Sequence, residues 1–220
     1  MNTLRPAFRS SLARTALAAA LAATLLGACA PVLIGGAAVG GAMMASDRRT
    51  SGAQVDDQSI ELKAGRRISE AIGDRGHINV TSFNRQVLLS GEVPSEADKS
   101  AVEQAVARIE NVRNVVNELA VMPNSSLGTR SNDALITSKL KATYVDSRDL
   151  FANAYKVVTE RGVVYLMGRV TEREATRGAN LARNVSGVQK VVTLFEIISE
   201  DELAQVRVIT APPPAASGPK

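Results

Sequence analysis

An internal duplication constrains the fold of this chain more than any other feature. Residues 87–93, with the sequence VLLSGEV, align with residues 164–170, with the sequence VYLMGRV. The match extends in both directions, and it pairs residues 78–80 with 155–157 and residues 112–116 with 188–192. Only two copies occur, whereas a solenoid needs three or more repeats to build its core, so the pattern indicates a duplicated domain.

The first half of the second copy is typical of a helix followed by a hairpin. Ser131, Asn132 and Asp133 offer an N-cap. Residues 155–159 and 163–168 alternate and are rich in β-branched residues, and Glu160-Arg161-Gly162 between them predicts a turn in which the glycine takes a positive φ. The expected buried stripe of the helix consists of Ile136, Leu140, Thr143 and Tyr144.

The second half of that copy predicts a helix and a final strand. Thr171 with Glu174 forms a capping box that opens a helix running to Val185, and Gly187 ends it. Residues 188–198 then form the last strand. In the first copy the corresponding signals are Asn84 at the hairpin turn, Ser95 with Asp98 at the second helix start, and Asn111 at its end.

We therefore predict an α+β fold of two tandem αββαβ domains, each with a small three-stranded mixed sheet packed by two helices. The linker between them is short, so the domains are expected to touch. The predicted segments are a signal peptide at 1–28, an acylated cysteine and spacer at 29–58, domains at 59–122 and 131–199 joined by a linker at 123–130, and a largely disordered tail at 200–220.

The N-terminus has the layout of a secretory leader. Arg5, Arg9 and Arg14 precede an uncharged stretch at 16–26, and the small residues before Cys29 resemble a bacterial lipobox. Cys29 is the only cysteine and is predicted to carry acyl chains. The alternatives are a buried thiol or an uncleaved membrane helix at 16–45, although glycines and a proline interrupt that run. In enterobacterial lipoproteins an aspartate directly after the acylated cysteine retains the protein at the inner membrane. This chain has Ala30 at that position, which favours the outer membrane.

Loss of the leader would leave the chain with a net charge close to zero. Cleavage after residue 28 removes three arginines and no acid, which leaves 23 basic against 22 acidic residues. The pI near 9.5 therefore reflects the leader in part, and it gives no support to nucleic-acid binding.

No catalytic, cofactor or metal motif is present in the sequence. His77, the only histidine, precedes a strand and is expected in an exposed loop. Glu172 and Glu174 are expected to interact with a helix dipole rather than to form a catalytic pair. Gly91 and Gly168 are expected to allow a tight exit from a strand, and Gly168→Val would unfold the second domain if the φ of Gly168 is positive.

The chain resembles dual BON-domain outer-membrane lipoproteins over residues 46 to 198. The resemblance rests on residues 47–57, on Ser-Asn-Asp-Ala-Leu-Ile-Thr at 131–137 and on residues 164–175. It implies a non-enzymatic lipoprotein that faces the periplasm and maintains envelope integrity, with anionic phospholipid bound by the second domain. It also implies links to outer-membrane assembly and cell division, possible enrichment at division sites, and no cofactor.

The residues themselves suggest where lipid would bind. On a helical wheel Leu135 points away from the buried stripe, with Lys139 and Lys141 on the helix and Arg130 just upstream. An exposed leucine among cations is typical of an interfacial anchor. The family often carries tryptophan at this position and this chain has none, so shallower insertion is expected.

The sequence leaves two alternatives to lipid binding open. Leu135 could pack against the first domain, or the same helix could bind a protein partner, which would make the protein an adaptor without lipid specificity. Arg66 and Arg67 in the first domain are surrounded by acids, so that helix is expected to face solvent or protein.

Overall fold

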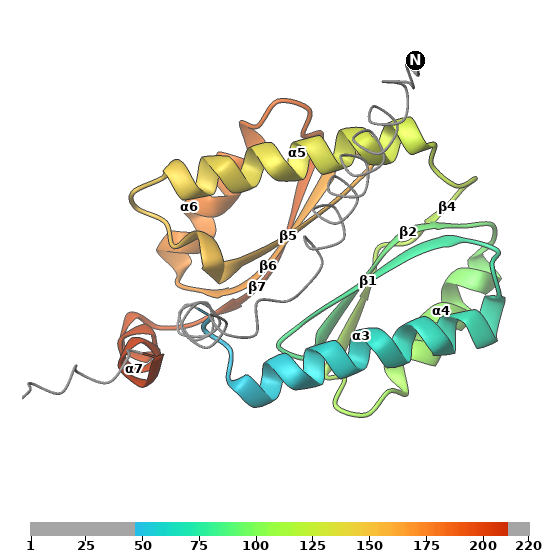
Figure 1. The fold of residues 1–220 in the computed structure, drawn as a ribbon, viewed down its shortest axis with the longest axis horizontal. Coiled ribbons are helices and arrows are strands. Elements are labelled where there is room, and N and C mark those ends of the chain that lie inside the picture. Colours follow the sequence, from blue (N-terminus) through green and yellow to red (C-terminus); the bar gives the residue numbers. More distant parts are fainter. Residues whose placement is uncertain (1–46, 211–220) are drawn as a thin grey trace, which may run out of the picture. The chain divides into compact units, whose positions relative to one another are not determined.

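The computed structural model describes residues 47–210, with side chains as far as Gln205. The predicted signal peptide, Cys29 and the segment 211–220 lie outside the described residues. Within the described range the two sequence copies form two αββαβ repeats (Figure 1).

The first repeat contains α3 (Ser51–Ile72), β1 (His77–Phe83), β2 (Gln86–Val93), α4 (Glu96–Ala107), β3 (Asn114–Asn117) and β4 (Ala120–Val121). Strand β2 is central, antiparallel to β1 and parallel to both β3 and β4. Because β3 and β4 pair with successive parts of β2, they act as one third strand, interrupted at Glu118 and Leu119. The predicted mixed three-stranded sheet is therefore confirmed.

The second repeat contains α5 (Leu127–Asp146), a 3-10 turn η1 (Ala152–Ala154), β5 (Tyr155–Glu160), β6 (Val163–Val170), α6 (Glu172–Arg183) and β7 (Lys190–Ile197). Its sheet has the order β5-β6-β7, with β5 antiparallel and β7 parallel to β6. Here the third strand is continuous over eight residues.

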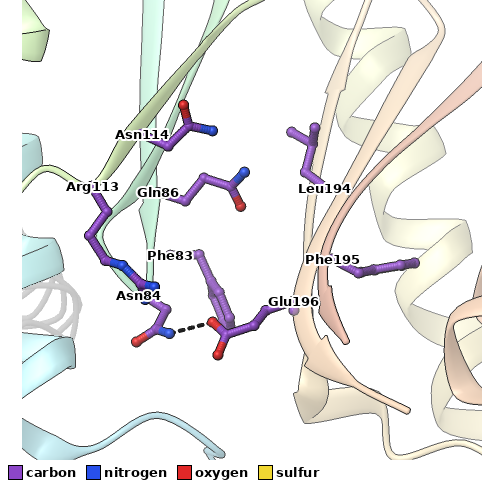
Figure 2. A pocket seen from close by; sticks show the side chains of 9 residues that line it. Phe83, Asn84, Gln86, Arg113, Asn114, Leu194, Phe195 and Glu196 are labelled. Atoms are coloured by element: carbon purple, nitrogen blue, oxygen red, sulfur yellow. Dashed lines mark hydrogen bonds between the residues drawn. The ribbon is translucent and has the colours of Figure 1, made fainter. Parts of the chain in front are cut away.

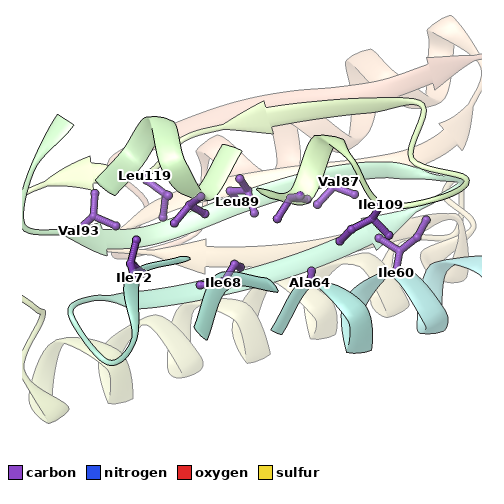
Figure 3. Close-up of a cluster of buried hydrophobic side chains, with 11 residues drawn as sticks. Ile60, Ala64, Ile68, Ile72, Val87, Leu89, Val93, Ile109 and Leu119 are labelled. Carbon is purple, nitrogen blue, oxygen red and sulfur yellow. The ribbon is translucent and has the colours of Figure 1, made fainter. Parts of the chain in front are cut away.

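The helices of each repeat cover one face of its own sheet (Figure 1). In the first repeat the stripe Ile60, Ala64, Ile68 and Ile72 of α3 packs on Val87 and Leu89 of β2 (Figure 3). In the second repeat Ile136, Leu140 and Tyr144 of α5 pack on Val164 and Leu166 of β6, as the spacing predicted, and Thr143 is half-buried at the margin.

The opposite faces of the two sheets share an apolar cluster. Phe83 and Leu88 of the first repeat and Tyr165 and Met167 of the second are its buried members. The central strands β2 and β6 are therefore buried on both faces, which explains their nearly continuous apolar sequences. The predicted contact between the domains is present.

The sequence signals for both hairpin turns and for the start of the second helix of each repeat are found where they were predicted. Asn84 and Arg85 have φ of 50° and 66°, and Arg161 and Gly162 have φ of 50° and 73°, so both hairpins turn through two residues with positive φ. Ser95 caps α4, and Thr171 with Glu174 forms the capping box of α6. Asn111 and Gly187 both have positive φ after the second helices, which themselves end earlier than expected, at Ala107 and Arg183.

Three boundaries differ from the prediction. Helix α3 begins at Ser51 with Thr50 as its N-cap, so the expected spacer to residue 58 is partly helical. Helix α5 begins at Leu127 with Ser126 as its N-cap, inside the expected linker. Helix α7 (Glu200–Thr210) occupies the start of the expected disordered tail and buries Leu203.

Asp133 is not the N-cap that the sequence indicated. Its carboxylate lies in the second turn of α5 and accepts hydrogen bonds from the backbone N–H groups of Arg161 and Gly162, at 2.7 and 2.8 Å. Asp57 of α3 accepts the same two bonds from Asn84 and Arg85, both at 2.7 Å. In each repeat a buried aspartate of the first helix therefore holds the strained hairpin turn.

The two strand glycines also differ from expectation. Gly91 and Gly168 lie within β2 and β6, and only Gly91 has a positive φ, of 116°. A Cβ atom at Gly168 would lie 2.3 Å from the backbone oxygen of Ala154. Close backbone approach, rather than φ, is what requires glycine at 168.

Candidate membrane-facing surface on helix α5

Helix α5 buries one side against the second sheet and leaves the other open. Ile136, Leu140 and Tyr144 are at most 1% exposed, and the Tyr144 hydroxyl donates a hydrogen bond to the Gly178 carbonyl at 2.9 Å. These contacts fix the rotation of α5 about its axis. The residues on its outer side are therefore presented to solvent in a defined arrangement.

The outer side carries three large apolar residues. Leu135 is 59% exposed, as the helical wheel predicted, and Leu127 and Val145 are 80% and 72% exposed. At 100° per residue all three fall within about 80° of arc and span about 27 Å of helix. They form an apolar row along most of the helix. Packing of Leu135 against the first domain does not fit this exposure.

Lysines lie on both sides of this row. Lys139 and Lys141 are exposed and project about 120° and −40° from the direction of Leu127. Arg130 is half-buried, and its Nε donates to Ser125 Oγ at 3.2 Å, so it is less available than the lysines. Asp146 is the exposed acid of α5, because Asp133 faces inward.

A polar hollow of about 300 Å³ adjoins the N-terminal half of α5. It is lined by residues of both repeats, among them His77, Asn79, Arg130 and Glu160. His77 begins β1 and is half-buried, so the expectation of an exposed loop is wrong. Burial raises the pKa of Glu160, against the opposing effects of a hydrogen bond from Asn79 and the charge of His77, while Glu92 and Asp133 raise it further.

A second hollow of about 350 Å³ lies between the sheets of the two repeats. Figure 2 shows Phe83, Asn84 and Gln86 of the first repeat facing Leu194 and Glu196 of β7 across it. The Asn84 amide donates to Glu196 Oε2 at 2.5 Å and bridges the gap. This bond adds a polar contact between the repeats beside the apolar cluster.

Other types of site find little support within residues 47–210. No group of three or more His, Cys, Asp or Glu residues in that range is placed to hold a metal ion. Among the helices of the same range, none combines the length and the hydropathy needed to cross a membrane. Glu174 is buried in its capping box and paired with Arg48 rather than open to a substrate.

Comparison with known proteins assigns the repeats to a family. The BON domain profile matches residues 56–123 and 132–199, which together make up more than half of the chain. The chain belongs to the BON-domain family. We refer to these two matches as BON1 and BON2; α5 is the first helix of BON2.

The relatives extend the match beyond the domains. The chain is 38% identical over 186 residues to the outer membrane lipoprotein DolP of Haemophilus influenzae, covering 83% of this chain and 95% of the relative. It is 31% identical over 154 residues to a 21 kDa hemolysin of Actinobacillus pleuropneumoniae, covering 69% and 79%. The protein is thus a DolP-like outer membrane lipoprotein with two BON domains, a family not known for enzymes, and the likeness implies membrane anchoring.

Two further similarities are weaker. The osmotically-inducible protein Y of Escherichia coli is 28% identical over 145 residues, covering 62% of this chain and 70% of the relative. Among solved structures, CdsD, a structural protein of the type III secretion system of Chlamydia trachomatis, matches with a TM-score of 0.27 and 14% identity over 66% of this chain and 95% of that chain.

Sequence reasoning missed Leu127 and Val145 as members of the α5 surface. The sequence places Leu127 in the linker, because the Ser131-Asn132-Asp133 cluster indicates a helix start after it. The signal that could have found it is Ser126, which precedes Leu127 and whose side chain accepts a hydrogen bond from Thr129 N at 3.1 Å. Both residues fall on the outer side once the helix is given its full length.

Proposed function

We propose that this protein is a non-enzymatic, acylated lipoprotein of the outer membrane whose BON2 domain binds anionic phospholipid through helix α5. The observation that carries the proposal is the exposed row Leu127, Leu135 and Val145, flanked by Lys139 and Lys141. Apolar residues that enter the interface and lysines that stay at the headgroups are the arrangement of an interfacial helix.

We expect helix α5 to have a low affinity for the membrane surface, and a low affinity is enough if acyl chains already attach the protein. One lysine near an anionic surface contributes about 1 kcal/mol, and burial of acyl chains about 0.8 kcal/mol per methylene. If Cys29 is acylated, the lipid chains provide attachment. Helix α5 then selects which lipid the folded domains face.

The test is flotation of a chain that begins at Ser46 and lacks the acylated cysteine. Residues 47–210 belong to one compact unit that holds every buried core cluster, so this chain retains the described contacts. We expect it to float with vesicles of anionic phospholipid, not with neutral ones, and to lose flotation at high salt.

The matched variants are Leu135→Glu on α5 and Leu62→Glu on α3, where Leu62 is 75% exposed. Leu135→Glu should abolish flotation and Leu62→Glu should leave it unchanged. No flotation of the parent chain with either lipid would contradict the proposal and favour the protein adaptor, with Cys29 as the membrane contact.

The resemblance extends the proposal to cell physiology. Support of envelope integrity predicts that cells lacking the protein become sensitive to detergent, and that the Leu135→Glu protein does not restore resistance. Enrichment at division sites predicts septal fluorescence of a tagged copy that depends on Leu135.

A further inference from the structure

Two consecutive arginines just before α3 are each bound to a different BON domain. Arg48 Nη1 and Nη2 donate to the two carboxylate oxygens of Glu174 in BON2, at 2.7 and 2.8 Å. Arg49 Nη1 donates to Asp57 Oδ2 in BON1 at 2.7 Å. We call residues 47–50 the strap.

The BON2 side of the strap is deeply buried. The side chains of Arg48 and Glu174 are 5% and 3% exposed. Arg48 also donates from Nη1 to the carbonyl of Arg169 at 2.9 Å, and Arg169 Nη1 donates back to the carbonyl of Arg48 at 2.9 Å. Arg48 lies 5.4 Å from the centre of the Phe151 ring, so this arginine contacts BON2 through its guanidinium and its backbone.

On the BON1 side, an ion pair and a contact with an aromatic ring hold Arg49. The guanidinium of Arg49 lies 4.4 Å from the centre of the Phe83 ring, and Asp47 accepts from its Nη2 at 2.6 Å. Asp57, its partner, is the same carboxylate that holds the BON1 hairpin turn. The Arg49 contact is thus built into the buried framework of BON1.

The strap has little freedom between these two attachments. Successive Cα atoms are about 3.8 Å apart, so one peptide unit joins a side chain fixed in BON2 to a side chain fixed in BON1. Thr50 then caps α3 by accepting a hydrogen bond from Ala53 N at 3.1 Å. This connection is separate from the linker between β4 and α5, and it adds to the apolar cluster and the Asn84–Glu196 hydrogen bond between the repeats.

We propose that the strap is an interdomain clamp: Arg48 and Arg49 lock BON1 and BON2 in one orientation and fix the point at which the membrane tether leaves the folded unit. This proposal does not depend on lipid binding by α5. It assigns a function to the segment next to the anchor, which the sequence suggested was a spacer.

The first test needs no substitution, because trypsin cleaves after arginine. A docked strap should be cut after Arg48 and Arg49 far more slowly in the folded chain than in a synthetic peptide of residues 44–53, with products followed by mass spectrometry. Cleavage in the folded chain at the rate of the peptide overturns the proposal.

The second test measures domain orientation. The chain from Ser46 has no native cysteine, so spin labels can be placed at Gln104→Cys on α4 and Ser138→Cys on α5, both exposed positions. The distance distribution between the labels should be narrow in the parent and broad in the double variant Arg48→Ala/Arg49→Ala. The matched control is Arg66→Ala/Arg67→Ala, which removes two exposed arginines of α3 and should leave the distribution narrow.

Circular dichroism shows whether each labelled variant is folded. A folded Arg48→Ala/Arg49→Ala chain that keeps the narrow distribution overturns the clamp, because the remaining contacts between the two sheets would then be sufficient to hold the domains. If that double variant does not fold, Arg49→Ala alone is measured instead, since it leaves the Arg48–Glu174 pair in place. A broad distance distribution in this variant supports the clamp, and a narrow one overturns it.

Discussion

Arg48 and Glu174 are 126 positions apart in the chain, yet they form a two-bond ion pair in which both side chains are almost completely buried. Burial acts to raise the pKa of Glu174, but the hydrogen bonds and the charge of Arg48 outweigh it and hold the pKa below its ordinary value. The charged form of buried Glu174 therefore depends on Arg48 for its stability.

We expect Arg48→Ala to destabilise the protein by about 3–5 kcal/mol, because it leaves an unpaired buried charge at Glu174. Urea unfolding of the chain from Ser46 measures this. The control is Arg173→Ala, since Arg173 and its partner Glu200 are both 62% exposed and 3.9 Å apart, and such a pair is worth about 0–1 kcal/mol. Equal losses in the two variants would contradict the prediction.

Gly168→Ala should destabilise BON2 even though φ at this position suits any residue. The new Cβ atom would lie 2.3 Å from the Ala154 carbonyl oxygen, and the forced shift of the backbone costs about 1–3 kcal/mol. Gly65→Ala, in an exposed part of α3 with no atom within 4 Å of the new Cβ, should instead stabilise by about 0.5–1 kcal/mol. Thermal or urea unfolding distinguishes the opposite signs.

Glu160→Gln should change the pH dependence of stability. The folded-state pKa of Glu160 is raised, so ionisation is less favourable in the folded state than in the unfolded one. Stability of the parent therefore falls as pH rises from the ordinary carboxyl pKa through the raised value, and glutamine removes this loss. We expect the advantage of Glu160→Gln to grow across that window and then to level off.

Urea unfolding from about pH 4 to about pH 8 tests this. Glu92 and Glu174 have lowered pKa values, so their contributions are lost at the acid end, below the ordinary carboxyl pKa. That loss is common to both chains and cancels in the difference. A difference that does not vary with pH would show that Glu160 does not titrate as described.

Leu135→Trp should strengthen binding to anionic vesicles if α5 lies in the interface. Indole rings favour the headgroup region, and the outward position of Leu135 has room for one. The control is Leu62→Trp on α3, for which no gain is expected. Flotation at increasing salt gives the comparison, and equal gains in both variants would indicate non-specific adsorption rather than docking of α5.

Local patterns were sufficient for much of the fold. The duplicated αββαβ order, the caps at Ser95 and Thr171 and the turns at Asn84 and Gly162 all depend on residues close together in sequence, so local chemistry determines them. The exposure of Leu135 followed from the helical period. The sequence did not predict the role of polar residues whose hydrogen-bond partners lie far away in the chain.

Asp133 illustrates that failure. It has the composition of an N-cap, but its carboxylate is used by a hairpin 28 residues away, and the true cap is Ser126. The partners of Arg48 and Arg49 were equally hidden, because no local pattern indicates which acid an arginine meets. One signal was available: Asp57 and Asp133 occupy similar places in the two copies, each upstream of the same turn.

If Cys29 carries the acyl chains, fixing the chain at Arg48 also sets the length of the tether to the membrane. From Cys29 to Arg48 there are about 19 residues, which reach about 60–70 Å at full extension. A spacer free as far as residue 58 would have about 29 residues. Because the effective concentration of a tethered group falls roughly as the −3/2 power of tether length, a tether of 19 rather than 29 residues would present the folded unit to its own membrane at about twice the local concentration.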